Sequence, residues 1–193
     1  NPHIYASQTT QTIMRDVLIA LFPAVVASIV FFGIQALLVE AVCVVVAVAC
    51  EWAFEKITHR TDTITDLSAA VTGLLLALNL PVSIPIWQAV FGSFVAIVVV
   101  KQLFGGIGQN FANPAITARV IMLVAFAGTM TTWAPAAFSN APADAVTAAT
   151  PLAILSAEGA AGELPSLVQM FLGARGGSMG ETSCLALLIG GIY

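Results

Sequence analysis

Long stretches without charge alternate with short polar stretches along this chain of 193 residues. No charged side chain occurs within 17–39, 41–50, 67–100 or 120–143. A helix needs about 20 mainly apolar residues to cross the hydrocarbon core of a bilayer. The pattern therefore predicts membrane-spanning helices at about 17–34, 36–55, 67–80, 86–103 and 114–131.

The third and the last of the apolar stretches differ from the others. The segment 67–80 is short for a full crossing and is followed by Pro81, so we expect a tilted or broken helix there. A sixth helix is expected to begin near Thr182 and to continue beyond the last residue, so the sequence is interpreted as a fragment of a longer membrane protein. No signal-peptide pattern is visible at the first residues. We divide the chain into a first membrane helical half (1–131), an outer-side loop (132–181) and the start of the next transmembrane helix (182–193).

Composition supports the membrane assignment. Hydrophobic residues make up 59% of the chain and charged residues 8%, whereas soluble domains carry about 25% charged residues. The net charge of −4 has the wrong sign for a nucleic-acid partner, and three cysteines make no disulfide framework. The expected fold class is an all-α polytopic membrane protein that contacts the lipid bilayer.

The basic residues predict an orientation. Arg15, Lys56, Arg60 and Lys101 all lie on one side if the N-terminus is cytoplasmic, as the positive-inside rule expects. The segment that follows the fifth helix then lies on the outer side of the membrane. Its acidic residues outnumber its single base, Arg175.

Several polar groups in or near the predicted spans have two interpretations. Cys43 and Cys50 lie about 10 Å apart along one helix, so we expect packed thiols and no metal site. Glu40, Glu51 and Arg119 lie close enough to helix ends to reach the interface, which is the favoured interpretation. The alternative is an ion path, since charges inside a membrane usually mark one.

The connection from Gly105 to Pro114 is rich in glycine, which permits positive φ angles. Asn113 followed by Pro114 is typical of an N-cap and the first helical residue. We expect a tight connection that caps the fifth helix. A broken helix that lines a ligand cavity is the alternative.

Two further helix starts are predicted in the outer loop. Thr150 and Pro151 fit an N-cap and first residue of a short helix that runs to about Ser156. Its free N–H groups would stabilise a phosphate near Thr150, although a plain capped helix explains the same pattern. Ser178 and Glu181 fit the capping box S-x-x-E.

Asp144–Leu152 resembles the flavinylation motif D-x-x-(S/T)-G-A-T-P-L. That motif belongs to the family of the RnfD protein of the Rnf electron-transport complex and the NQR2 protein of the sodium-pumping NADH:quinone reductase. Further segments similar to this family are Asn1–His3, Ile13–Met14, Thr72–Pro81, Lys101–Gly106, Gly108–Asn110, Asn113–Ala115, Gly180–Ser183 and Gly190–Tyr193. The early Asn1–His3 makes the resemblance closer to the Rnf member of the family.

The resemblance implies FMN joined by a phosphoester to Thr150 and installed by a flavin transferase. Asp144, Thr147 and Ala149 match the motif, whereas Ala148 stands where the family usually has glycine. A methyl group there is expected to slow modification if the glycine serves a backbone turn. Further candidate cofactor-binding residues are Glu181, Thr182, Asn113 and Arg119. The resemblance also allows a second, non-covalent riboflavin.

The implied fold is a bundle of about ten helices in two inverted halves, of which this chain would hold five to six segments. The implied function is electron transfer between ferredoxin and NAD, coupled to Na⁺ or H⁺ export across a bacterial or archaeal cell membrane. The isoalloxazine then carries the redox chemistry, and no catalytic residue is expected from the chain itself. The implied partners are other membrane and peripheral redox subunits, one with its own FMN. The alternatives are the corresponding quinone-reductase protein and a channel-like solute transporter.

Overall fold

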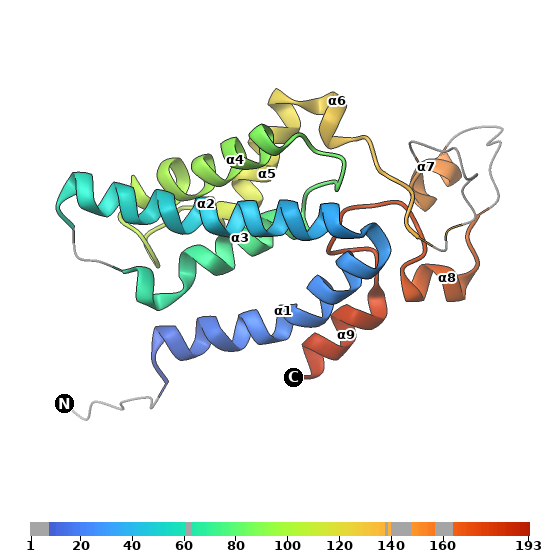
Figure 1. Cartoon of the computed structure of the whole chain (residues 1–193), viewed down its shortest axis with the longest axis horizontal. Coiled ribbons are helices and arrows are strands. Elements are labelled where there is room, and N and C mark those ends of the chain that lie inside the picture. The colour runs from blue at the N-terminus through green and yellow to red at the C-terminus, as the bar shows by residue number, and fades with distance from the viewer. Residues whose placement is uncertain (1–7, 61–62, 138, 140–147, 157–163) are drawn as a thin grey trace.

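The structure is a computed structural model that describes residues 8–60, 63–137, 139, 148–156 and 164–193. These residues form helices and the segments that connect them (Figure 1). The elements are α1 (Thr10–Phe32), α2 (Ile34–Thr58), the 3₁₀ turn η1 (Ile64–Asp66), α3 (Ser68–Leu78), α4 (Ile86–Phe94), the π-helix η2 (Val95–Gln102), α5 (Pro114–Ala125), α6 (Ala127–Met130), α7 (Pro151–Ser156), α8 (Leu167–Leu172) and α9 (Cys184–Ile192).

Two helices among the described residues, α1 and α2, are long and apolar enough to cross a membrane. They have 23 and 25 residues and are joined at Gly33, whose φ of +73° is easily reached only by glycine. α1 begins earlier than predicted, because the Thr9 side chain accepts a hydrogen bond from Thr12 N and caps the helix there. Arg15 and Asp16 consequently lie inside the helix rather than before it.

The other three predicted spans are shorter helices. α3 has 11 residues, or about 16 Å of helix, which confirms that this segment is short for a full crossing. α4 continues directly into η2, which is wound as a π-helix. The predicted 114–131 helix is interrupted at Phe126, whose ring makes edge-on contacts with Trp87 and Phe91 of α4 at centroid distances of 5.2 and 5.6 Å.

α2 lies at the centre of the bundle and packs against α1, α3, α4 and η2 (Figure 1). Its contact with α3 is close because Gly73 faces it. A Cβ at Gly73 would lie 2.7 Å from Cys43 O and 2.9 Å from Ala47 Cβ. α9, which begins two residues after the predicted Thr182, packs against α1 at the Gly33 end of the bundle.

Gly73→Val is expected to destabilise the bundle, since the added side chain meets the α2 backbone and not a flexible side chain. We expect a loss of about 1–3 kcal/mol, the usual cost of overpacking a core. The measurement is the thermal unfolding temperature of the purified protein in detergent. Gly191→Val is the control, because nothing lies within 4 Å of a Cβ at Gly191.

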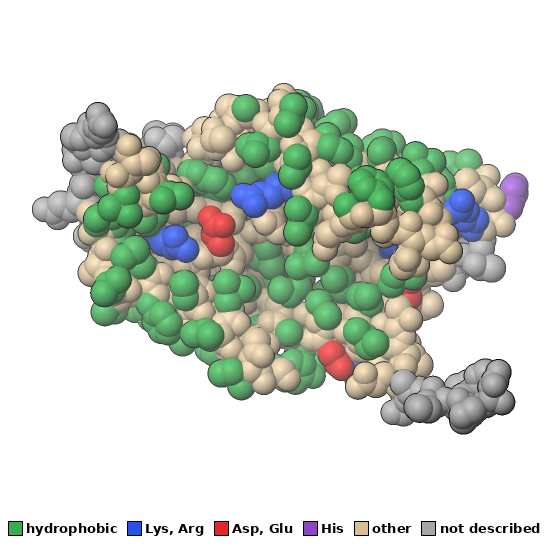
Figure 2. All heavy atoms as spheres, turned by 180° about the vertical axis from the view of Figure 1, so that it is seen from behind, with side chains coloured by type: hydrophobic (Ala, Val, Ile, Leu, Met, Phe, Trp, Pro, Cys, Tyr) green, Lys and Arg blue, Asp and Glu red, His purple; other side chains and the backbone are tan. Residues whose placement is uncertain are grey.

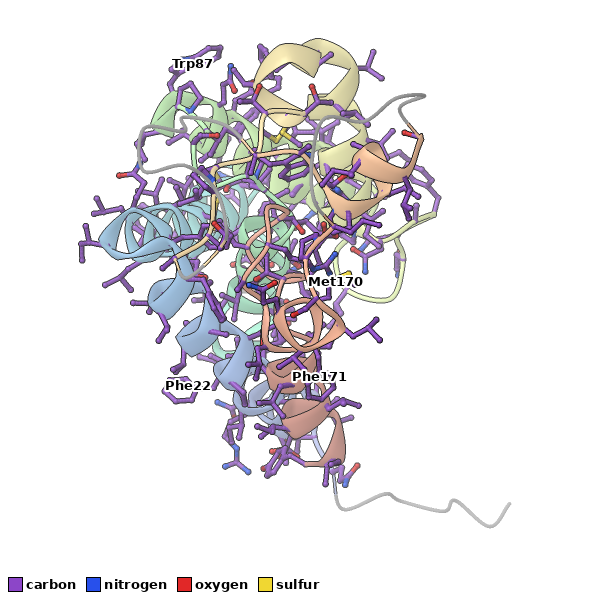
Figure 3. The ribbon with its side chains drawn as sticks, turned by 90° about the vertical axis from the view of Figure 1, so that its right-hand side faces the viewer. Phe22, Trp87, Met170 and Phe171 are labelled. Atoms are coloured by element: carbon purple, nitrogen blue, oxygen red, sulfur yellow. The ribbon has the colours of Figure 1, made fainter. Side chains whose placement is uncertain are left out.

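Apolar side chains cover the outside of the molecule as well as its core. Figure 2 shows hydrophobic side chains spread over the whole visible face, with few charges among them. Phe22 and Trp87 are 63% and 60% exposed and point away from the bundle in Figure 3. A surface of this kind is consistent with a helical protein that contacts lipid.

Candidate functional site

Thr150 caps the short helix α7, as the sequence predicts. Its Oγ1 accepts a hydrogen bond of 3.2 Å from Ala153 N, and its carbonyl accepts one from Ile154 N. Thr150 is half-buried, and among the described residues its hydroxyl donates no hydrogen bond. The hydroxyl hydrogen can therefore be replaced by another group without breaking a contact.

The residues just before Thr150 lie between two other segments. Ala148 N donates a 2.8 Å hydrogen bond to Trp133 O, and Gly176 faces the Ala148 methyl group so closely that its own Cβ would lie 3.0 Å away. Ala148 has no positive φ, so the backbone at this position does not require glycine. Asp144 and Thr147, the other motif residues, lie outside the described residues, whereas Ala149 is exposed.

A loop around Arg175 connects this segment to the end of α3. The Arg175 guanidinium donates to Glu181 O at 2.8 Å and to Thr182 O at 3.5 Å. Gly180 N donates to Leu78 O at 2.7 Å, which anchors the loop on the last turn of α3. Thr182 is fully buried and Glu181 is exposed.

The predicted helix start at Ser178 is wrong. Glu181 Oε1 does accept a 3.3 Å bond from Ser178 N, but the chain forms a turn at this point. The helix begins at Cys184, and its N-cap is Ser183, whose side chain accepts from Ala186 N. Half of the capping-box pattern is thus used in a turn that precedes the helix.

Arg119 and Asn113 occupy different places. Asn113 caps α5 as predicted, with its Oδ1 accepting from Ala115 N and Ile116 N. Arg119 is half-buried, and its Nη1 donates to Asn79 Oδ1 at 3.4 Å. Asn79 follows Leu78, so Arg119 reaches the same end of α3 that holds the Arg175 loop, and Asn113 does not.

Glu40 and Glu51 are not within reach of solvent in this chain. Their exposed fractions are 3% and 0%, so the expectation that both extend to the interface is wrong. Glu51 Oε1 forms an ion pair with Lys101 Nζ at 2.6 Å and accepts from Gln102 Nε2 at 2.7 Å. Consecutive residues of an ideal α-helix point about 100° apart, whereas the π-helical winding of η2 accompanies this double contact.

The described residues fit a phosphoester at Thr150. Oγ1 acts only as an acceptor there, and an ester oxygen retains lone pairs for the Ala153 N–H. Leu152 and Leu155 of α7 are 76% and 67% exposed, which leaves apolar surface beside the attachment point. The candidate site is therefore the segment Ala148–Thr150 with α7 and the Arg175 loop.

The chain matches the model of the family described as "NQR2, RnfD, RnfE family" over residues 1–193. This chain belongs to that family. It is 48% identical over 195 residues to the D component of the Na⁺-translocating ferredoxin:NAD⁺ oxidoreductase complex of Acetobacterium woodii. It is 42% identical over 200 residues to the D component of the proton-translocating ferredoxin:NAD⁺ oxidoreductase complex of Clostridium ljungdahlii. Both alignments cover 100% of this chain and 60% of the relative.

The family assignment confirms the resemblance seen in the motifs, and the chain spans about 60% of the length of these two relatives. Two features of the molecule were missed by sequence reasoning. The Arg175 contacts were not predicted, although a lone base in an acidic loop was a usable signal. The buried Glu51–Lys101 pair was not predicted either, because both residues lie near helix ends where charges are ordinarily solvated.

Proposed function

We propose that this chain is the membrane part of a redox subunit that carries FMN as a phosphoester on Thr150. The observation that carries the proposal is the Thr150 hydroxyl, which caps α7, donates no hydrogen bond among the described residues and lies in a match to the flavinylation motif. Membership of the NQR2, RnfD, RnfE family supports it. When bound, the flavin supplies one- and two-electron chemistry.

The chain's own residues anchor and position this group. Thr150 Oγ1 supplies the ester oxygen, and the N–H groups at the start of α7 favour negative charge near it. Trp133 O fixes Ala148 through its N–H, and Arg175 ties the neighbouring loop to the carbonyls of Glu181 and Thr182. Asp144 and Thr147 are proposed to serve recognition by a flavin transferase.

The cellular setting is proposed from the relatives' names and the charge pattern. The whole protein would act with other membrane and peripheral redox subunits, one with its own FMN, in electron transfer between ferredoxin and NAD coupled to Na⁺ or H⁺ export. It would lie in a bacterial or archaeal cell membrane with a cytoplasmic N-terminus and Thr150 on the outer side. Five to six segments of a roughly ten-helix inverted-repeat bundle, and a second site for riboflavin, belong to the same proposal.

Peptide mass spectrometry on the denatured protein tests the attachment. We expect the peptide that contains Thr150 to be heavier by FMN less one water, with fragment ions that place the addition on Thr150. The protein should come from a host with an active flavin transferase. An unmodified peptide from such a host would refute the proposal.

Ala148→Gly is expected to leave the ratio of covalent flavin to protein unchanged within about twofold. The reason is that Ala148 has no positive φ and its N–H is already bonded to Trp133 O. The measurement is flavin fluorescence of the denatured protein divided by protein amount. A severalfold increase would show that the methyl group obstructs modification.

A further inference from the structure

Two carboxyl groups are buried on α2 about three turns apart, and their surroundings differ. Glu51 is paired with Lys101 Nζ at 2.6 Å and with Gln102 Nε2 at 2.7 Å. Glu40 is 3% exposed, and its hydrogen-bond partner among the described residues is Ser28 of α1, with 2.5 Å between Ser28 Oγ and Glu40 Oε1. An ionised carboxylate without a paired cation is costly in such a place, so the charge state of Glu40 needs a separate argument.

The hydrogen atoms around Ser28 supply that argument. Ser28 Oγ lies 2.7 Å from Val25 O as well as 2.5 Å from Glu40 Oε1. A hydroxyl has one hydrogen, and a backbone carbonyl has none to give. If Ser28 donates to Val25 O, the hydrogen between Ser28 and Glu40 belongs to Glu40. Glu40 Oε2 is also buried and has no donor among the described residues, whereas an ionised carboxylate would call for several.

Among the described residues, no positive charge faces Glu40 from the elements packed against α2. Those elements are α1, α3, α4, η1 and η2. Their charged residues are Arg15 and Asp16 near the far end of α1, Asp66 in η1, which accepts from Ser68 N, and Lys101 in η2, which is held by Glu51. Cys43, one turn along α2, is titratable but positive in neither form. The segment that covers the α1–α2 corner, where Ala137 N donates to Phe31 O, is uncharged from 120 to 143.

We propose that Glu40 is held as a neutral carboxylic acid and is a proton-binding site inside the helix bundle. In the protonated state Glu40 donates to Ser28 Oγ, and Ser28 donates to Val25 O. On release, the O–H bond of Glu40 breaks, the proton leaves to water, and the Ser28 hydroxyl turns its own hydrogen to the carboxylate. Glu40 lies about 10 Å along α2 from Gly33, so the release path is short. This inference does not rest on the flavin.

Infrared spectroscopy of the full-length protein in its complex, in lipid vesicles at neutral pH, tests the proposal. We expect a C=O stretching band of a protonated carboxylic acid that shifts in D₂O and is absent in Glu40→Gln. Glu51→Gln is the matched control and should retain the band, because Glu51 is the paired carboxylate of the same helix. Identical spectra of the wild type and Glu40→Gln in the carboxylic-acid region would overturn the proposal.

Ser28→Ala gives a second reading that does not need Glu40→Gln to accumulate. Removing the hydroxyl takes away the acceptor of the Glu40 hydrogen, so the band should move to higher wavenumber and persist. Glu40→Gln itself is expected to unfold within about 2 °C of the wild type, since a neutral amide replaces a neutral acid and one kcal/mol corresponds to roughly 2–4 °C. A band that Ser28→Ala leaves unmoved would contradict the assignment.

Discussion

Lys101→Met is expected to destabilise the protein by about 3–5 kcal/mol, the usual cost of leaving one partner of a buried ion pair uncompensated. The Lys101 side chain is 3% exposed and that of Glu51 is fully buried, so water cannot replace the lost ammonium. Ser68 Oγ, 2.6 Å from Lys101 Nζ, loses its partner as well. Methionine keeps the apolar stem, and the loss therefore reports on the charge. Thermal unfolding in detergent, followed by circular dichroism, is the measurement.

The double variant Lys101→Met/Glu51→Gln separates the pair from the packing. We expect it to recover much of the stability, because the uncompensated carboxylate is then gone. Arg15→Met is the matched control, since Arg15 and Asp16 form an exposed pair at 3.6 Å with side chains 63% and 43% exposed. Such pairs contribute about 0–1 kcal/mol. Equal losses in Lys101→Met and Arg15→Met would mean that the buried pair is not a source of stability.

The sequence predicts helix positions well where the signal is local. Thr150 with Pro151 and Asn113 with Pro114 are caps whose geometry depends on a few adjacent residues, and the structure places helix starts at both. The Ser178–Glu181 pattern fails because the same reciprocal contact also closes a turn, and Ser183 is as good a cap five residues later. Local chemistry allowed both sites, and packing of the loop on Leu78 and Leu80 accompanies the later one.

Burial of charge is the part that local pattern could not predict. Glu51 and Lys101 are fifty residues apart, and their meeting depends on how α2, α3 and η2 pack. The π-helical winding of η2, which accompanies the contacts of both Lys101 and Gln102 with Glu51, has no signature in the alternation of apolar and polar residues. The candidate flavin site is different, since Thr150 was identified from a motif, whereas the positions of Trp133 and Arg175 beside it needed the fold.

Thr150→Asn is expected to abolish covalent flavin, a loss of more than about tenfold in the fluorescence of the denatured protein. Asparagine has no hydroxyl to form the phosphoester, yet it is among the best N-cap residues. Its side chain can accept the Ala153 N–H that Thr150 Oγ1 accepts, so α7 should keep its start. The loss would then be chemical and not a consequence of an unfolded helix. Fluorescence per protein after gel separation is the measurement.

Thr150→Ser completes the comparison, because serine has both the hydroxyl and the capping oxygen. We expect it to retain covalent flavin, although the smaller side chain can reduce the rate at which the transferase modifies it. Flavin in Thr150→Ser but not in Thr150→Asn assigns the ester to the side-chain oxygen at position 150. Covalent flavin at the wild-type level in Thr150→Asn would place the attachment on another residue, and the proposed redox role of this segment would then fail.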